Sequence, residues 1–84
     1  MKPKRNYEIT YQSVRSKNYL IKQNQMFEVS DHGIEIWQLL NGERTVDEVV
    51  EIMAERYRFD ASHGQERNLI EQFISFLQDK QMLD

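Results

Sequence analysis

The first third of the chain alternates apolar and polar residues in the way that β-strands do. Residues 9–14 and 19–21 are rich in β-branched and aromatic side chains, and polar residues separate them. The run Met26–Val29 follows a polar turn, and its alternation places Phe27 and Val29 on one face of an extended segment. We therefore predict a small antiparallel meander whose third strand is Met26–Val29.

After this strand the apolar positions change to the period of helices. An apolar stripe runs over residues 34–40, with Ser30 or Asp31 available to cap its start and Asn41-Gly42 to stop it in a left-handed turn. Thr45 and Glu48 have the spacing of a capping box, which opens a second helix.

A polar break over residues 60–65 separates the second helix, Val46–Arg58, from a third, which we predict over about Glu66–Lys80. The order of elements is thus βββααα, an α+β fold with a three-stranded antiparallel sheet followed by three helices. The core stripe of the last helix consists of Ile70, Phe73, Ile74 and Leu77.

A chain of 84 residues makes one small domain. We assign it to residues 7–84 and expect the polar residues 1–6 to be a flexible basic end. Trp37 is expected to anchor the core. No apolar run approaches the roughly 20 residues that span a bilayer, and the first residues are too polar for a secretory signal. We expect the cytoplasm as its location and no membrane contact.

The composition offers little chemistry for catalysis. There is no cysteine, the two histidines are far apart in the sequence, and the three glycines are not clustered in a phosphate-binding loop. The acidic residues of the second helix recur at helical spacing, which is typical of a solvated face. We therefore predict that the chain is not an enzyme and holds no metal and no cofactor.

Charge is distributed unevenly along the chain. Residues 1–24 hold six basic and one acidic residue, whereas residues 25–84 hold five basic and thirteen acidic residues. A basic strand-rich end therefore precedes an acidic helical body. This asymmetry fits either a solvated surface with a frayed basic terminus or a field that steers a charged partner.

A small sheet with three helices also suggests a winged helix-turn-helix, so DNA binding has to be weighed. Each of the last two predicted helices carries only two basic residues, against four acidic residues in the second and three in the third. Neither helix would approach phosphates favourably. We expect no nucleic-acid partner, although a DNA-binding regulator stays as the alternative because the basic end could contact phosphate.

Residues 27–50 resemble the PqqD-like family. Phe27–Leu40 is similar to its signature of a short strand, a turn of helix with small residues, then Ile-Trp and Leu-Leu, and Asn41–Val50 is similar to its continuation G-x-x-T-V-x-E-I-V. The resemblance covers roughly residues 19–84. The family's Leu-Asn is Val-Ser here, an acidic residue near the start of the last helix is Leu69, and a glycine near the end is Gln81.

This resemblance implies a winged helix-turn-helix-like fold and a function in recognising ribosomally made, modified peptides. Such domains bind the leader region of a precursor peptide and present it to a modifying enzyme. Free-standing members serve lasso peptide synthesis, where the partner is a leader peptidase, or pyrroloquinoline quinone synthesis, where the partner is a radical SAM enzyme. The Ile-Trp and Thr-Val-Asp-Glu-Val-Val segments resemble the lasso type slightly more.

In that family the leader adds as a strand to the edge of the third strand and lies against the third helix. Here the corresponding edge is Gln25–Val29, and an edge strand can pair with an extended peptide of any sequence. Leu69, Phe73 and Phe76 share one flank of the third helix and are expected to form the groove wall. The alternative is that Leu69 and Phe76 complete the core or a dimer contact.

Lys22, Arg67 and Lys80 are candidates to pair with acidic residues of the leader. Because an exposed edge could also pair between copies, we expect a monomer or a weak dimer. The predicted peptide site consists of Gln25, Met26, Phe27, Glu28, Val29, Arg67, Leu69, Ile70, Phe73, Phe76, Leu77 and Lys80.

Overall fold

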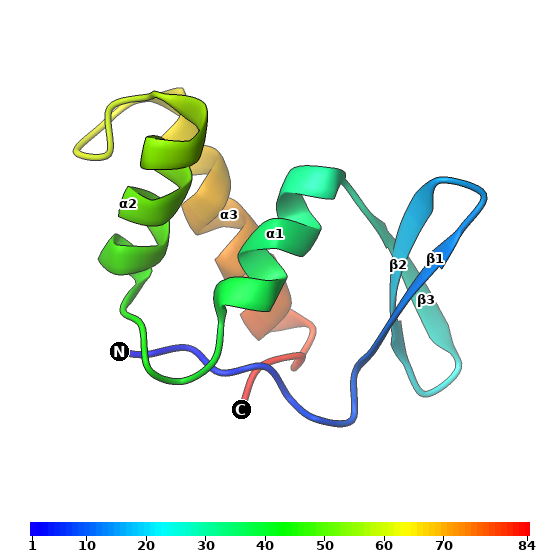
Figure 1. Cartoon of the computed structure of the whole chain (residues 1–84). Coiled ribbons are helices and arrows are strands. Elements are labelled where there is room, and N and C mark those ends of the chain that lie inside the picture. Colours follow the sequence, from blue (N-terminus) through cyan, green and yellow to red (C-terminus); the bar gives the residue numbers. More distant parts are fainter.

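A computed structural model describes residues 1–84 and places a three-stranded sheet beside three helices (Figure 1). The α+β fold with the order βββααα is confirmed. The strands are β1 (Thr10–Val14), β2 (Lys17–Lys22) and β3 (Gln25–Val29), and the helices are α1 (Asp31–Leu39), α2 (Val46–Tyr57) and α3 (Gln65–Asp79). None of these helices combines the length and the apolar character that crossing a bilayer requires.

Two tight turns build the sheet. Arg15 and Ser16 connect β1 to β2 with positive φ angles of 53° and 67°, a geometry that suits the right-handed twist of a two-residue hairpin. β2 pairs antiparallel with both neighbours, so the strand order is β1-β2-β3. β1 and β3 are therefore the two edge strands, each with one side of its backbone unpaired.

Local capping starts the first two helices as the sequence predicts. The Ser30 side chain accepts a hydrogen bond from the Gly33 amide at 3.1 Å and caps α1. At α2, Thr45 accepts from the Glu48 amide and the Glu48 carboxylate accepts from the Thr45 amide, which is the predicted capping box. The helix α2 ends at Arg58, which takes the left-handed conformation with φ 59°.

The core lies where the three helices meet β2 and the end of β3. Trp37 is only 4% exposed, which confirms it as a core residue. The remaining fully buried side chains come from every part of the chain, so that the sheet, the helices and the C-terminal tail share one core. These side chains are Leu20, Leu40, Val49, Val50, Leu77 and Met82.

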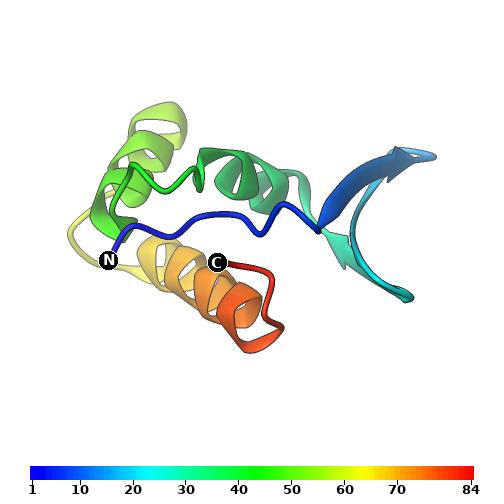
Figure 2. The ribbon, with the colours of Figure 1, turned by 90° about the horizontal axis from the view of Figure 1, so that it is seen from below.

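Residues 1–6, for which we expected a flexible end, are placed against the rest of the molecule in the structure. The amide of Arg5 donates to the Leu40 carbonyl at 3.0 Å, and the amide of Asn6 donates to the Met82 carbonyl at 2.9 Å. The Arg5 guanidinium donates to the Trp37 carbonyl in the last turn of α1, which also accepts from the Leu40 amide. Figure 2 shows this segment running between α1 and α3. The local sequence does not reveal such pairing, because every partner is distant in the chain.

Candidate functional site

The exposed edge of β3 is the first part of the candidate site. β3 pairs with β2 on one side only. Gln25, Met26 and Glu28 are exposed, Phe27 is half-buried, and Val29 joins the core. The free edge of β3 therefore has unpaired backbone N–H and C=O groups along its five residues. The buried side chain of Val29 anchors the end of the strand in the core.

Three phenylalanines form an aromatic wall between this strand and α3. The Phe27 and Phe76 rings meet edge to face with their centroids 5.9 Å apart, and Phe73 stacks on Phe76 at 6.3 Å. All three rings are half-buried, so each keeps a part of its surface in reach of a ligand. Figure 2 shows β3 and α3 on the same side of the molecule. The predicted groove wall of α3 is thus brought next to the predicted edge.

Two lysines mark one end of the aromatic wall. The Lys22 ammonium donates to the Lys80 carbonyl at 2.8 Å, at the C-terminal end of α3. The Lys80 ammonium lies 6.0 Å from the centroid of the Phe27 ring. Both positions favour a cation, since carbonyls without helical partners and an aromatic face attract positive charge. This end of the site is therefore basic.

A cavity of about 500 Å³ lies at the other end of the wall. It opens between the start of α1, the end of α2 and the first half of α3, and Leu69, which is 55% exposed, lines it together with Phe73. The remaining lining residues are Ser30, His32, Gly33, Ile36, Met53, Tyr57, Arg58, Phe59, Glu66 and Ile70. Of the predicted site residues, Leu69, Ile70 and Phe73 thus line this cavity.

Gly33 makes the close approach of α1 to the aromatic wall possible. A methyl group at this position would lie 2.4 Å from Cγ1 of Val29 and 3.4 Å from Cε1 of Phe73. Only a glycine allows the end of β3, the first turn of α1 and the Phe73 ring to meet there. In the sequence, Gly33 falls within the small-residue turn of the family pattern, and no local signal marks it as a site residue.

The α2 side of the cavity was also missed from the sequence. Met53 and Tyr57 stand at helical spacing in the sequence, as core residues of one helix face do, but Tyr57 is 44% exposed. Its ring meets His32 edge to face at 4.7 Å. Its hydroxyl donates to the Glu35 carboxylate, and this hydrogen bond raises the pKa of Tyr57 above its ordinary 10.0. No sequence signal links these residues, because the contacts join two helices.

Arg67 is not brought to the aromatic wall or to the basic end. Its guanidinium donates to the Asp47 carboxylate and to the Ala61 carbonyl, and it lies 3.7 Å from Glu71. The hydrogen bond to Asp47 raises the pKa of Arg67. Arg67 therefore connects α3 to the first turn of α2. Leu77 is fully buried and supports the wall from within.

Comparisons with known proteins now place this fold. Residues 13–83 match the family model described as "Coenzyme PQQ synthesis protein D (PqqD)". The chain belongs to the PqqD family. The resemblance that we drew from residues 27–50 is therefore confirmed. Membership of this family agrees with the prediction that the chain is not an enzyme.

Two solved structures share the fold of this PqqD-family chain. One is TbiB1 in complex with the TbiA(beta) leader peptide, with a TM-score of 0.75 and 19% identity over 96% of this chain and 94% of that one. The other is the PqqD truncation of Methylobacterium extorquens PqqCD, described as a functional and stand-alone RiPP recognition element, with a TM-score of 0.78 and 20% identity over 98% of this chain and 87% of that one. A comparison with curated protein sequences gives no match. At these identities the two structures establish the fold alone.

Proposed function

We propose that this protein binds the leader region of a ribosomally made precursor peptide as an added strand on β3 and presents it to a modifying enzyme. The observation that carries the proposal is the unpaired edge of β3 with the aromatic wall of Phe27, Phe73 and Phe76 beside it. An edge strand supplies backbone hydrogen bonds, and an apolar wall next to it supplies side-chain pockets. The likeness to TbiB1, whose structure includes a leader peptide, supports the same reading.

In this proposal the guest peptide lies in the groove between β3 and α3. Its backbone pairs with Gln25–Val29, while alternate side chains point toward α3 and contact Phe73 and Phe76. One apolar side chain near an end of the guest enters the cavity beside Leu69. Acidic residues at the other end of the guest pair with Lys22 and Lys80. Backbone pairing with β3 provides affinity, and the contacts at the cavity and at the two lysines provide specificity for the sequence of the guest.

As the partner enzyme we propose a leader peptidase of lasso peptide synthesis, on the strength of the Ile-Trp and Thr-Val-Asp-Glu-Val-Val segments. The alternative is a radical SAM enzyme of pyrroloquinoline quinone synthesis, and the TM-scores to TbiB1 and to PqqD are similar. We place this step in the cytoplasm, where the precursor is translated. We expect the protein to act as a monomer or a weak dimer.

Amide spectra of the labelled protein test the proposal. The leader peptide of the precursor encoded beside this gene is added, and shifts are expected along Gln25–Val29 and over residues 69–80. Saturable shifts elsewhere would place the peptide at another surface. A folded protein with no shifts at high excess of this peptide would contradict leader binding by the isolated domain.

A further inference from the structure

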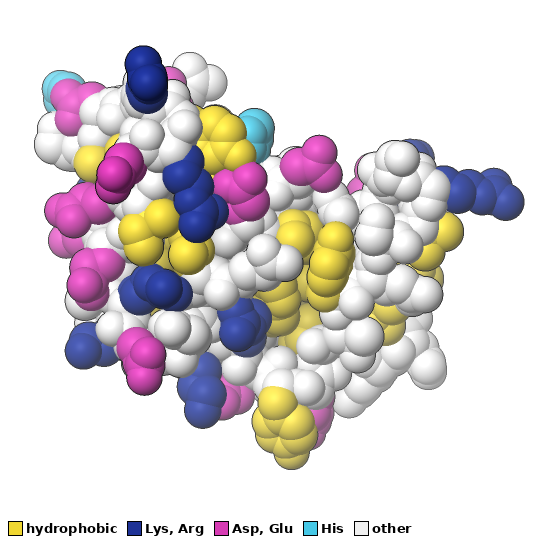
Figure 3. Space-filling view, in the orientation of Figure 1, with side chains coloured by type: hydrophobic (Ala, Val, Ile, Leu, Met, Phe, Trp, Pro, Cys, Tyr) yellow, Lys and Arg dark blue, Asp and Glu magenta, His cyan; other side chains and the backbone are white.

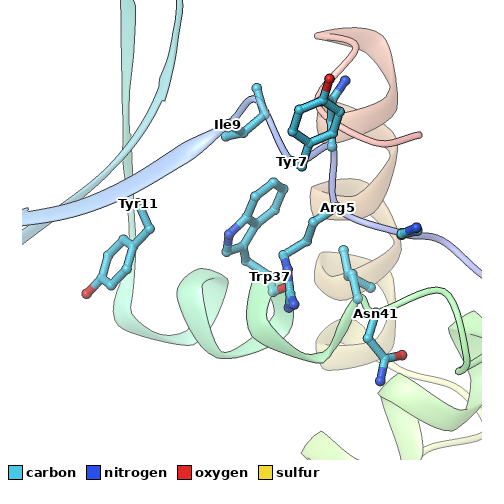
Figure 4. A pocket seen from close by; sticks show the side chains of 9 residues that line it. Arg5, Tyr7, Ile9, Tyr11, Trp37 and Asn41 are labelled. Atoms are coloured by element: carbon cyan, nitrogen blue, oxygen red, sulfur yellow. The ribbon is translucent and has the colours of Figure 1, made fainter.

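A second cavity, of about 430 Å³, lies outside the proposed leader groove. It opens between α1, β1 and the segment before β1, and Figure 4 shows its lining residues. Its apolar floor consists of Ile9, Trp37 and Leu40, and Tyr11 of β1 stands at its side. In the space-filling view, apolar side chains gather in a hollow between α1 and the sheet (Figure 3).

Tyr7 lines this cavity with an exposed side chain, although backbone hydrogen bonds fix the residues on both sides of it. The residue as a whole is 89% exposed. On one side, the Asn6 amide donates to the Met82 carbonyl at 2.9 Å, and on the other, the Ile9 amide donates to the Asn6 carbonyl at 3.0 Å. The Asn6 side chain also accepts from the Glu8 amide at 2.9 Å. An aromatic ring presented on an ordered turn loses little conformational entropy when it is buried by a partner.

Two basic residues without ion pairs line the same cavity. The Arg5 guanidinium donates to the Trp37 carbonyl at the end of α1, and no carboxylate pairs with Arg5 or with Lys4. The acidic residues of the neighbouring segments, Glu8, Glu43 and Asp84, also form no ion pair. The basic surplus of residues 1–24 therefore includes cations that are available at this cavity.

β1 adds a second unprotected sheet edge to this region. Its residues are Thr-Tyr-Gln-Ser-Val, all exposed, with no charge and no proline that would discourage pairing with another chain. Figure 2 shows β1 and α1 on the side of the molecule away from β3 and α3. A partner bound here leaves the β3 edge and the aromatic wall free.

We propose that this surface, the α1–β1 face (Tyr7, Tyr11 and Trp37 with Lys4 and Arg5 at its rim), docks a segment of a partner protein. The segment carries an aromatic or aliphatic side chain between acidic residues. The apolar side chain fills the cavity beside Trp37, and the acidic residues pair with the rim. Nucleic acid fits less well, because residues 25–84 carry a net charge of −8 and the cavity floor is apolar. The proposal does not rest on leader binding at β3.

Intrinsic fluorescence tests this proposal directly, because Trp37 is the one tryptophan of the chain and lines the cavity. The probe is the capped peptide Ac-Glu-Glu-Ser-Phe-Ser-Glu-Glu-NH2, which contains no tryptophan. We expect a saturable change in Trp37 emission at low salt. The peptide with lysine in place of glutamate should bind about fivefold more weakly, because it cannot form the exposed ion pairs with Lys4 and Arg5.

Three variants separate binding at the α1–β1 face from general charge effects. Tyr7→Ser, at an exposed side chain, should weaken binding of the acidic peptide about tenfold, as loss of an aromatic anchor does. Lys4→Glu should weaken it as well, whereas Lys17→Glu, with the same charge change in the β1–β2 hairpin, should leave it near the wild-type value. All three proteins are checked for wild-type amide spectra before the titration.

Three results would overturn the proposal. The first is equal affinity for the acidic and the basic peptide. The second is an unchanged Trp37 emission when the amide shifts show that the protein is saturated with peptide. The third is binding of a single-stranded oligothymidylate but not of the acidic peptide. Amide shifts along β3 and α3 on leader addition are read separately, so failure at one site does not affect the conclusion about the other.

Discussion

Replacing Leu69 with glutamate tests the leader groove without disturbing the core. Leu69 is 55% exposed, lines the cavity at the end of the aromatic wall, and lies on an outer flank of α3. The carboxylate of the variant can stay in water while the protein is free. In a complex with the leader peptide, the same carboxylate would be covered by the guest.

The expected loss can be worked out from the exposure of Leu69. Complete burial of a leucine side chain is worth about 1.5–3 kcal/mol, so covering the exposed half of Leu69 contributes about 1 kcal/mol to binding. Leaving a polar group without partners in the complex costs at least about 1 kcal/mol more. The sum of about 2 kcal/mol corresponds to a leader affinity about 30-fold weaker.

Calorimetric titration with the leader peptide measures this loss. Gln72→Glu is the matched control, because Gln72 is exposed on the same helix, gains the same charge and does not line the cavity. Urea unfolding of both variants should resemble that of the wild type. Wild-type affinity in a folded Leu69→Glu protein would refute the groove, and an equal loss in Gln72→Glu would show that overall charge, and not the cavity, weakens binding.

Three further predictions concern the frame of the site. Gly33→Ala should lower the free energy of unfolding by about 1–3 kcal/mol in urea, because the added methyl group has no room beside β3 and the aromatic wall; an unchanged midpoint would contradict this. Phe27→Pro and Glu28→Pro should differ, since successive amides of β3 point alternately toward β2 and toward the free edge. One should stay folded and lose leader binding while the other loses stability, and equal behaviour of the two would argue against strand addition. The amide of Thr45 donates to the Glu48 carboxylate and lowers the pKa of Glu48 below its ordinary 4.5, so that the fold favours the ionised form. The stability advantage over Glu48→Gln should therefore be present above pH 4.5 and fade as the pH falls through the lowered pKa; a gap independent of pH would show that ionised Glu48 contributes nothing.

Much of the fold followed from local patterns. The alternation in Met26–Val29 predicted β3, and the spacing of Thr45 and Glu48 predicted the capping box that starts α2. The spacing of Leu69, Phe73 and Phe76 placed these three on one flank of α3. Such features could be predicted because each depends on residues within a few positions of one another.

Tertiary structure alone decided how these pieces meet. It joined Tyr57 of α2 to the cavity, turned Arg67 toward Asp47 instead of the groove, and held Arg5 and Asn6 against α1 and the C-terminal tail. In each case the partners are tens of residues apart in the chain. Their contact depends on how the helices pack around the shared core, and a local sequence pattern carries no information about that packing.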